Sequence, residues 1–277
     1  MTTLDLLAGE RIVVKVGSSS ISGERRGQIE PLVDGLARLH REGQVILVSS
    51  GAISTGMPYL GLDARPADLP MQQAAAAVGQ NVLMNRYQRS LTRHEVVAAQ
   101  ILLTASDMDM DSHRVNARNA LERLLELRML PIVNENDTVA TSEIRFGDND
   151  RLAARVAQMA GADVLVLLSD IDGLYDADPR ENPQASLIPL VDEITPAIEA
   201  MAGPPAEQGV GSGGMVTKIG AAKIALAGGS SMVIMNGQTD APVTRLLQGE
   251  ACTLFATGTD PLAVRKRWIQ GMMAPKG

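Results

Sequence analysis

The chain has 277 residues, 45% of them hydrophobic and 21% charged, a composition typical of a globular protein with a full apolar core. A formal net charge of −7 and an aromatic content of 2% argue against nucleic-acid binding, which needs a basic surface and, for single strands, aromatic rings on which bases stack. The single cysteine, Cys252, fits a reducing compartment, and the lack of a signal peptide or of an apolar run near the ~20 residues of a membrane helix predicts a cytoplasmic protein.

Apolar, β-branched runs alternate with segments of helical periodicity along almost the whole chain. The predicted strands are Arg11–Val16, Val45–Val48, Val96–Leu103, Pro131–Val133, Val164–Leu168, Met232–Met235 and Thr253–Phe255. The predicted helices cover roughly Ile29–Leu39, Gln72–Leu91, Asn116–Arg128, Asp150–Ala160 and Met215–Ala227. Val139–Phe146 alternates polar and apolar residues, which predicts a small hairpin. This order predicts an α/β fold, a three-layer αβα sandwich with a mainly parallel central sheet.

The length alone fits one large domain or two small ones. We expect a single domain with a core at about residues 10–257, because no linker plainly divides the chain. Gly203–Pro205 is the best candidate for a boundary, although proline and glycine are equally common in surface loops.

Short polar segments follow four of the predicted strands. They are Gly17–Ser20, Ser49–Ala52, Asn134–Asp137 and Ser169–Gly173. Ligands of parallel α/β proteins bind outside the carboxyl ends of the strands, and small residues there let backbone N–H groups approach an anion. Four such segments on one edge of the sheet predict a site for a polar ligand.

Two lysines lie beside glycine-rich segments. Lys15 interrupts an apolar strand two residues before Gly17, and it either lies on an edge strand with its amine reaching water or points from the strand end at phosphate. Lys218 ends the segment Gly211–Lys218 at the start of an apolar helix, an arrangement suited to phosphate, although a solvated lysine on a surface loop is the alternative. No strand precedes these glycines, so they do not predict a dinucleotide-binding turn.

The acidic residues Asp148 and Asp150 precede or begin a predicted helix. They either cap the helix, hold the lysines in position or take part in magnesium binding. The three histidines have no carboxylate, cysteine or second histidine at ligand spacing, so we expect no zinc site and no nucleophilic triad.

Six segments resemble, in the same order, motifs of the amino-acid kinase family. They are V-V-K-V-G-S-S at 13–19, S-S-G-A-I-S-T-G at 49–56, N-E-N-D-T-V at 134–139, F-G-D-N-D at 146–150, S-D-I-D-G-L-Y at 169–175 and G-S-G-G-M-V-T-K at 211–218. More narrowly, N-E-N-D, G-D-N-D, the turn Ala177–Arg180 and R-K-R-W-I at 265–269 resemble the glutamate kinases of this family. The resemblance implies the amino-acid kinase fold and transfer of phosphate from ATP, with Mg²⁺, to the side-chain carboxylate of L-glutamate, the first step towards proline.

The resemblance also implies roles for individual residues. Lys15 and Lys218 would contact the transferring phosphoryl group, and Asp150 would hold both lysines. Ser50, Asp137 and Asn149 match positions that bind glutamate. The positions that bind the nucleotide are matched by Lys15, Ser169, Asp170, Ser212, Gly213, Gly214, Met215, Val216, Thr217 and Lys218.

The family further implies feedback inhibition by proline near the glutamate site and assembly into a homo-oligomer, a dimer or a tetramer. Bacterial members usually continue past R-K-R-W-I into a PUA domain, which we expect to be absent because the chain stops at Gly277. The alternatives are a sister kinase acting on aspartate, acetylglutamate, carbamate or a nucleoside monophosphate, and a non-catalytic anion binder. A non-catalytic binder predicts loss of the lysines, but both are present.

Overall fold

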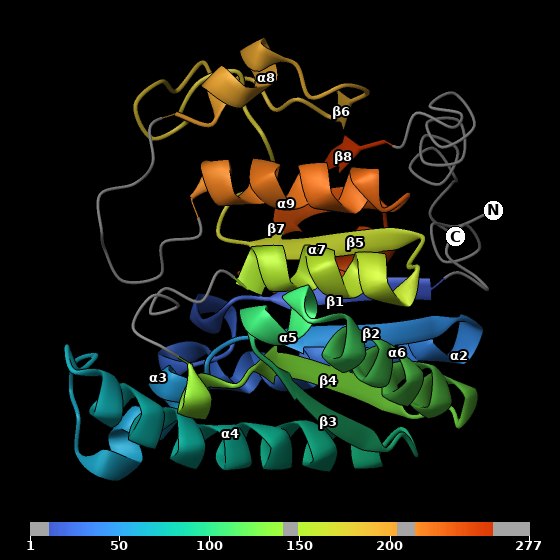
Figure 1. Ribbon diagram of the computed structural model, residues 1–277. Helices are drawn as coiled ribbons and strands as arrows, with labels where there is room; N and C mark the ends of the chain where they lie inside the picture. The colour runs from blue at the N-terminus through green and yellow to red at the C-terminus, as the bar shows by residue number, and fades with distance from the viewer. Residues whose placement is uncertain (1–10, 141–148, 204–213, 257–277) are drawn as a thin grey trace.

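A single eight-stranded sheet forms the centre of the molecule (Figure 1). The computed structural model describes residues 11–140, 149–203 and 214–256. The sheet has the order β3-β4-β2-β1-β5-β7-β8-β6, and each pair of neighbouring strands is parallel except β7 and β8. The strands are β1 (Arg11–Val16), β2 (Gln44–Ser49), β3 (Ala98–Leu103), β4 (Leu130–Glu135), β5 (Val164–Ser169), β6 (Leu190–Val191), β7 (Ser231–Asn236) and β8 (Thr253–Phe255). The predicted mainly parallel sheet is confirmed.

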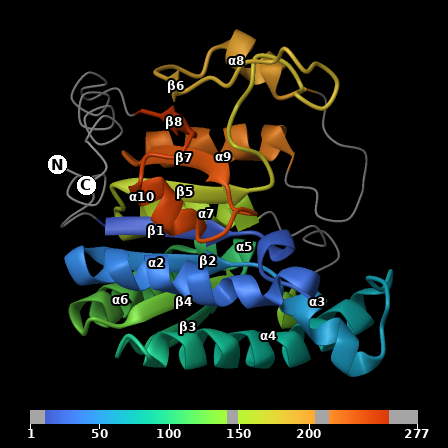
Figure 2. The same cartoon turned by 180° about the vertical axis from the view of Figure 1, so that it is seen from behind.

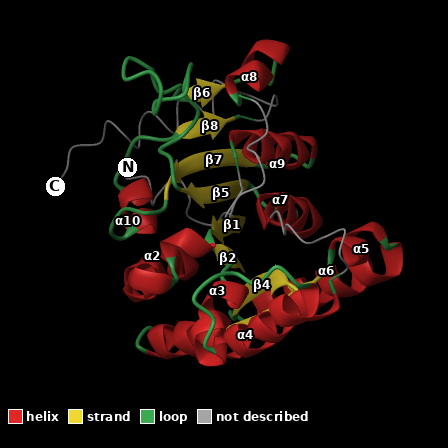
Figure 3. Ribbon diagram, turned by 90° about the vertical axis from the view of Figure 1, so that its left-hand side faces the viewer, coloured by secondary structure: helices red, strands yellow, loops and turns green. Residues whose placement is uncertain are grey.

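Helices cover both faces of this sheet, which confirms the predicted three layers (Figure 3). The face towards the viewer in Figure 1 carries α5 (Ala105–Asp109), α6 (Asp111–Glu126), α7 (Asn149–Ala160) and α9 (Met215–Ala227). The opposite face, seen in Figure 2, carries α2 (Ile29–Glu42) and α10 (Pro242–Leu247), and α4 (Leu69–Thr92) packs beside α2. Among the described residues, no helix combines the length and the apolar character needed to cross a membrane.

The alternation of side chains along β1 divides the core into two clusters. Ile12, Val14 and Val16 pack in the cluster with α2 and α10, whereas Val13 packs in the cluster with α7 and α9. Because side chains of a strand alternate between faces, Lys15 shares the face of Val13 and lies towards α7. β1 is flanked by β2 and β5, so the interpretation of Lys15 as an edge residue is wrong.

The strand order reverses direction next to β1. After β1 the chain builds β2, β3 and β4 on one side, then returns through α7 to place β5 on the other side. The carboxyl ends of β1, β2, β4 and β5 therefore meet at one edge of the sheet. In open α/β sheets such a reversal opens a crevice for a ligand at this edge.

Most predicted elements are confirmed, and the bounds of several differ by one to five residues. α6 begins at Asp111 rather than Asn116. The sequence pattern missed its first turns because they face solvent and carry no apolar periodicity. β4 continues through Asn134 and Glu135, which pair with the end of β3 despite their polar side chains. A 3₁₀ helix at Asp137–Val139 takes the start of the predicted hairpin, and residues 141–148 lie outside the described ranges. The elements that the sequence pattern missed are short: α3 (Ala52–Gly56), α5, α8 (Pro196–Met201), α10 and β6.

Candidate active site

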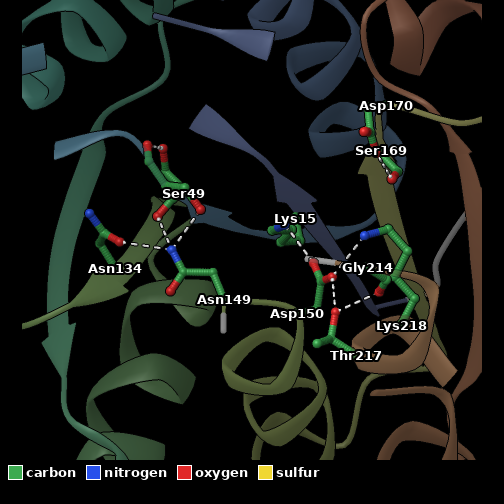
Figure 4. Close-up of polar contacts among 11 residues, drawn as sticks. Lys15, Ser49, Asn134, Asn149, Asp150, Ser169, Asp170, Gly214, Thr217 and Lys218 are labelled. Atoms are coloured by element: carbon green, nitrogen blue, oxygen red, sulfur yellow. Dashed lines mark hydrogen bonds and ion pairs between the residues drawn. The ribbon is translucent and has the colours of Figure 1, made fainter. Parts of the chain in front are cut away.

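One buried carboxylate joins two lysines at the carboxyl edge of the sheet (Figure 4). The Oδ1 atom of Asp150 lies 2.5 Å from Nζ of Lys15, and its Oδ2 atom lies 3.2 Å from Nζ of Lys218. The side chain of Asp150 is 1% exposed, that of Lys218 5% and that of Lys15 12%. Two cations share one carboxylate in a region shielded from water, and these three groups together carry one net positive charge, which suits an anion.

Three separate elements bring these charges together. Lys15 is near the end of β1, Asp150 lies in the first turn of α7, and Lys218 lies in the first turn of α9. The first turns of α7 and α9 therefore both lie at the cluster, and the free N–H groups at helix N-termini favour negative charge there. The cluster thus joins two lysines and two helix N-termini, a combination suited to phosphate.

The ionisation of Asp150 is set by opposing effects. Burial raises the pKa of its carboxyl, but the charges of Lys15 and Lys218 and their hydrogen bonds outweigh burial and hold the pKa below the usual value. The hydroxyl of Thr217 lies 3.4 Å from Asp150 Oδ2 and donates a hydrogen bond to the carbonyl of Gly214 at 2.8 Å. Asp150 therefore stays ionised and keeps both ammonium groups in place.

A second polar group surrounds Asn149, the residue before Asp150. Its Nδ2 atom donates to Ser50 Oγ at 2.6 Å and lies 3.3 Å from both the carbonyl oxygen of Ser49 and Oδ1 of Asn134. Its Oδ1 atom is buried and, within the described residues, accepts no hydrogen bond. A buried acceptor without a donor is costly, which indicates that a ligand N–H group belongs there.

Two further residues hold this polar group from behind, and the sequence interpretation did not single out either. Nδ2 of Asn134 donates to Oε1 of Gln80 at 2.7 Å, and the hydroxyl of Tyr87 lies 2.9 Å from Ser49 Oγ. Burial raises the pKa of Tyr87 well above its usual value, so its hydroxyl stays protonated. Asn134 was visible in the polar run after its strand, but Gln80 and Tyr87 lie within the helical pattern of α4 and gave no signal.

The loop that carries Ser50 depends on close helix packing. Gly51 has φ of +95°, a conformation that side chains disfavour, and α3 begins directly after it. A Cβ atom at Gly56 would lie 1.9 Å from the carbonyl oxygen of Ala75, and one at Gly79 would lie 1.8 Å from that of Ala52. Glycine at both positions lets α3 and α4 approach until their backbones touch, and this contact fixes the Ser50 loop.

Asp137, the third residue predicted to bind glutamate, lies beyond the end of β4. Burial raises the pKa of its carboxyl to about 6, although the nearby Arg65 opposes the shift. Within the described residues no hydrogen bond joins its side chain to Ser50 or Asn149. The structure therefore places Asp137 at the same edge of the sheet without direct contact to the other two.

The structure describes some of the residues predicted to bind the nucleotide. Ser169 ends β5, and its hydroxyl donates to Oδ1 of Asp170 at 3.0 Å. Gly214 caps α9 and residues 215–218 form its first turn, whereas Ser212 and Gly213 lie outside the described residues. In Figure 4, Ser169 and Asp170 lie on the side of the cluster that carries Lys218, away from Asn149. The edge thus has two parts, with Asn149 on one side of the charge cluster and the end of β5 on the other.

Solved structures with little sequence identity share this fold. A UMP kinase from Ureaplasma parvum covers 90% of this chain with a TM-score of 0.59 and 13% identity. A carbamate kinase from Giardia lamblia bound to AMP-PNP covers 91% with a TM-score of 0.62 and 14% identity. At these identities the likeness establishes the arrangement of strands and helices.

Relatives in sequence are much closer. The glutamate 5-kinase of Bradyrhizobium diazoefficiens is 50% identical over the whole of this chain, which covers 76% of that enzyme. The glutamate 5-kinase of Caulobacter vibrioides is 51% identical over 98% of this chain, and that of Leifsonia xyli is 59% identical over 82%. A model of the amino acid kinase family matches residues 10–236. This chain therefore belongs to the amino acid kinase family.

Proposed function

We propose that this chain is a kinase that phosphorylates the side-chain carboxylate of L-glutamate from ATP, giving L-glutamyl 5-phosphate for proline biosynthesis. Relatives named glutamate 5-kinase, about 50% identical over the full chain, support this activity. The observation that carries it is the pairing of Asp150 with Lys15 and Lys218 directly beside Asn149. The cluster of Asp150 with the two lysines is suited to a transferring phosphate, and the polar group around Asn149 is suited to an amino-acid ligand.

The proposed reaction needs charge stabilisation more than acid–base catalysis. The nucleophile is a carboxylate with an ordinary pKa of about 4.3, so it is ionised at neutral pH and requires no general base. Phosphoryl transfer develops charge on the oxygens of the transferring group, and groups already in place lower its barrier most. Lys15 and Lys218 would meet that charge, while Asp150 keeps both ammonium groups fixed before the substrates arrive.

Glutamate would be held on the Asn149 side of the cluster. Oδ1 of Asn149 would accept a hydrogen bond from the amino group of the substrate, which supplies the donor that this buried oxygen lacks. The hydroxyl of Ser50 would bind a carboxylate, and the ionised carboxylate of Asp137 would attract the amino group. Holding the amino-acid end here would direct the side-chain carboxylate towards Lys15 and Lys218.

The nucleotide would lie on the opposite side, against Ser169, Asp170, the segment Ser212–Gly214 and the first turn of α9 from Met215 to Lys218. Among the described residues there is no group of three or more His, Cys, Asp or Glu that could hold a metal by itself. This fits Mg²⁺, which protein sites bind largely through nucleotide phosphates and water. Bound with ATP, Mg²⁺ would neutralise part of the phosphate charge.

The proposal also includes inhibition by proline and assembly into an oligomer. Proline, an amino acid with both an ammonium group and a carboxylate, would compete at the Asn149 side of the site and inhibit the enzyme. The chain would assemble into a homo-oligomer, a dimer or a tetramer. Inhibition kinetics with glutamate as the varied substrate test the first feature, and light scattering of the purified protein tests the second.

The acceptor is tested by measuring ADP release, with ATP as donor, over a panel of possible acceptors. The panel contains L-glutamate, L-aspartate, N-acetyl-L-glutamate, carbamate and UMP. We expect glutamate to give by far the highest kcat/KM. N-acetyl-L-glutamate and UMP lack the free amino group that Asn149 and Asp137 would bind, and the relatives named glutamate 5-kinase favour glutamate over aspartate and carbamate. A clear preference for any other member of the panel would refute the proposed substrate.

A further inference from the structure

A second candidate binding site lies on the outer surface of the helices in front of the sheet in Figure 1. There α7 forms the floor of a groove of about 840 Å³, and α5 with α6 and α9 form its walls. None of the residues assigned above to glutamate, ATP or phosphoryl transfer lines this groove. Its size falls within the range of sites for small molecules.

The lining of the groove is strongly basic in a chain whose net charge is −7. Its charged side chains are Arg114, Arg118, Arg151, Arg155, Lys223 and the single acid Asp109. The basic side chains come from both walls and from the floor, so they converge on one space. Four of the five are arginines, whose planar guanidinium groups bind phosphate with two parallel hydrogen bonds.

Three of these basic side chains pair with carboxylates that face water. Arg155 lies 2.7 Å from Asp109, Lys223 lies 2.8 Å from Glu199, and Arg114 pairs with the neighbouring Asp111. The side chains of Asp109, Asp111 and Glu199 are 67%, 88% and 46% exposed. Exposed ion pairs of this kind are weak, so an incoming phosphate can replace the carboxylates at little cost.

Between the charges the groove is apolar. Met108 and Met159 are buried at its base, and Ile224 contributes from α9. Val115 on α6 is 52% exposed, which leaves an apolar surface uncovered beside the arginines. A simple inorganic anion would not use the apolar surface that Val115 and Ile224 leave open to water, whereas a ligand with an apolar or planar part would cover it.

We propose that this groove binds a small phosphorylated ligand, with the phosphate held by arginines and the apolar part resting on Val115 and Ile224, beside the buried Met108 and Met159. Phenyl phosphate is a suitable probe because it combines both chemistries, and inorganic phosphate is the comparison that lacks the ring. Binding is followed by NMR of methyl-labelled methionine in the full chain, with Met108→Leu and Met159→Leu used to assign the two signals. These signals report on the groove and separate it from phosphate binding at Lys15 and Lys218.

We expect phenyl phosphate to shift both methionine signals in a saturable way and to bind severalfold more tightly than inorganic phosphate. Arg118→Glu on one wall and Lys223→Glu on the other should each weaken binding on the order of tenfold, as expected for loss of a charge-assisted hydrogen bond. Arg123→Glu is the matched control, because Arg123 lies on the same helix as Arg118, is 74% exposed and does not line the groove. The affinity of this variant should stay within about twofold of wild type, since an exposed charge outside the groove makes no hydrogen bond to the ligand and is partly screened.

Three results would overturn the proposal. Absence of a saturable shift at Met108 and Met159 would show that the groove binds no such ligand. An equal loss of affinity in Arg123→Glu and Arg118→Glu would show that only overall charge matters. Equal affinity for phenyl phosphate and inorganic phosphate would refute the proposed ligand class. Arg118, Lys223 and Arg123 are exposed, so thermal denaturation should show all three variants folded like wild type.

Discussion

Asp150 is a single residue on which the stability of the buried charge cluster depends. It is the carboxylate between two largely buried ammonium groups, and removal of one partner from a buried ion pair leaves charge that water cannot reach. We expect Asp150→Asn to lower the free energy of unfolding by about 3–5 kcal/mol, measured by urea denaturation at pH 7. Asp34→Asn is the control, since Asp34 is 49% exposed in its pair with Arg93 and should lose at most about 1 kcal/mol.

The stabilisation that Asp150 contributes should depend on pH in a defined way. The folded state holds the pKa of Asp150 below its ordinary value of 3.8, so the stabilisation is fully present above that value and is lost as pH falls through the lower folded pKa. The difference in stability between wild type and Asp150→Asn should therefore narrow only below about pH 4. A difference of under 1 kcal/mol at pH 7 would contradict the assigned ion pairs.

The raised pKa of Asp137 predicts that kcat/KM for glutamate depends on pH, in a range above that in which Asp150 affects stability. The pKa of Asp137 is raised to about 6, so the carboxylate that we propose attracts the substrate amino group becomes protonated as pH falls through 6. We expect kcat/KM for glutamate, at saturating MgATP, to fall about tenfold from pH 7 to pH 5, because the ionised fraction falls by that factor. Asp137→Asn should show low activity with no such decline, and an equally flat profile in wild type would exclude this role for Asp137.

At the scale of elements, the contact between α3 and α4 positions the Ser50 loop. Gly79→Ala would place a Cβ atom 1.8 Å from the carbonyl oxygen of Ala52, and neither backbone can move without separating the helices. We expect a loss of 3 kcal/mol or more, roughly the upper range of overpacking, together with a raised KM for glutamate. Thermal denaturation and glutamate kinetics provide the measurements.

The chain offers a matched glycine for comparison. Gly220 lies inside α9, and a Cβ atom there would meet nothing within 4 Å. Gly220→Ala should therefore stabilise the protein by roughly 0.5–1 kcal/mol, since alanine is the better helix former. Similar effects of the two substitutions would show that the contact between α3 and α4 does not constrain the site.

Elements with strong periodicity were predictable, and those without it were not. The bounds of α9 and of the fully buried β8 agree with the pattern. The start of α6 was missed because its first turns face solvent, and the end of β4 was missed because pairing with β3 overrides the polarity of Asn134 and Glu135. β6 has only two residues, which give too little pattern to detect.

At the scale of the whole molecule, the sequence predicted the edge that carries the site but not all of its contacts. Lys15, Asp150 and Lys218 were found from their positions beside glycines and at helix starts, and the structure brings them together. The resemblance supplied Ser50 and Asn149, which do contact each other. Gln80 was missed because its role depends on the packing of α4 against the sheet, which no local pattern encodes.

The described strands form one continuous sheet with a core on each face, which supports our proposal that residues 10–257 form one kinase domain. We expect thermal unfolding in a single cooperative transition, with near-UV and far-UV circular dichroism giving the same midpoint. Separate midpoints would indicate two units, and Gly203–Pro205 would then be the boundary to examine.

The central claim is that Lys218 stabilises the phosphoryl group during transfer to glutamate. The most direct test measures ATP-dependent glutamyl phosphate, trapped with hydroxylamine as the hydroxamate, for wild type and Lys218→Ala. We predict that the variant loses kcat by on the order of 10²-fold or more, as expected when a group that stabilises transition-state charge is removed. Arg123→Ala, at an exposed position on α6, should retain wild-type turnover. A folded Lys218→Ala variant with near-normal kcat would contradict the account.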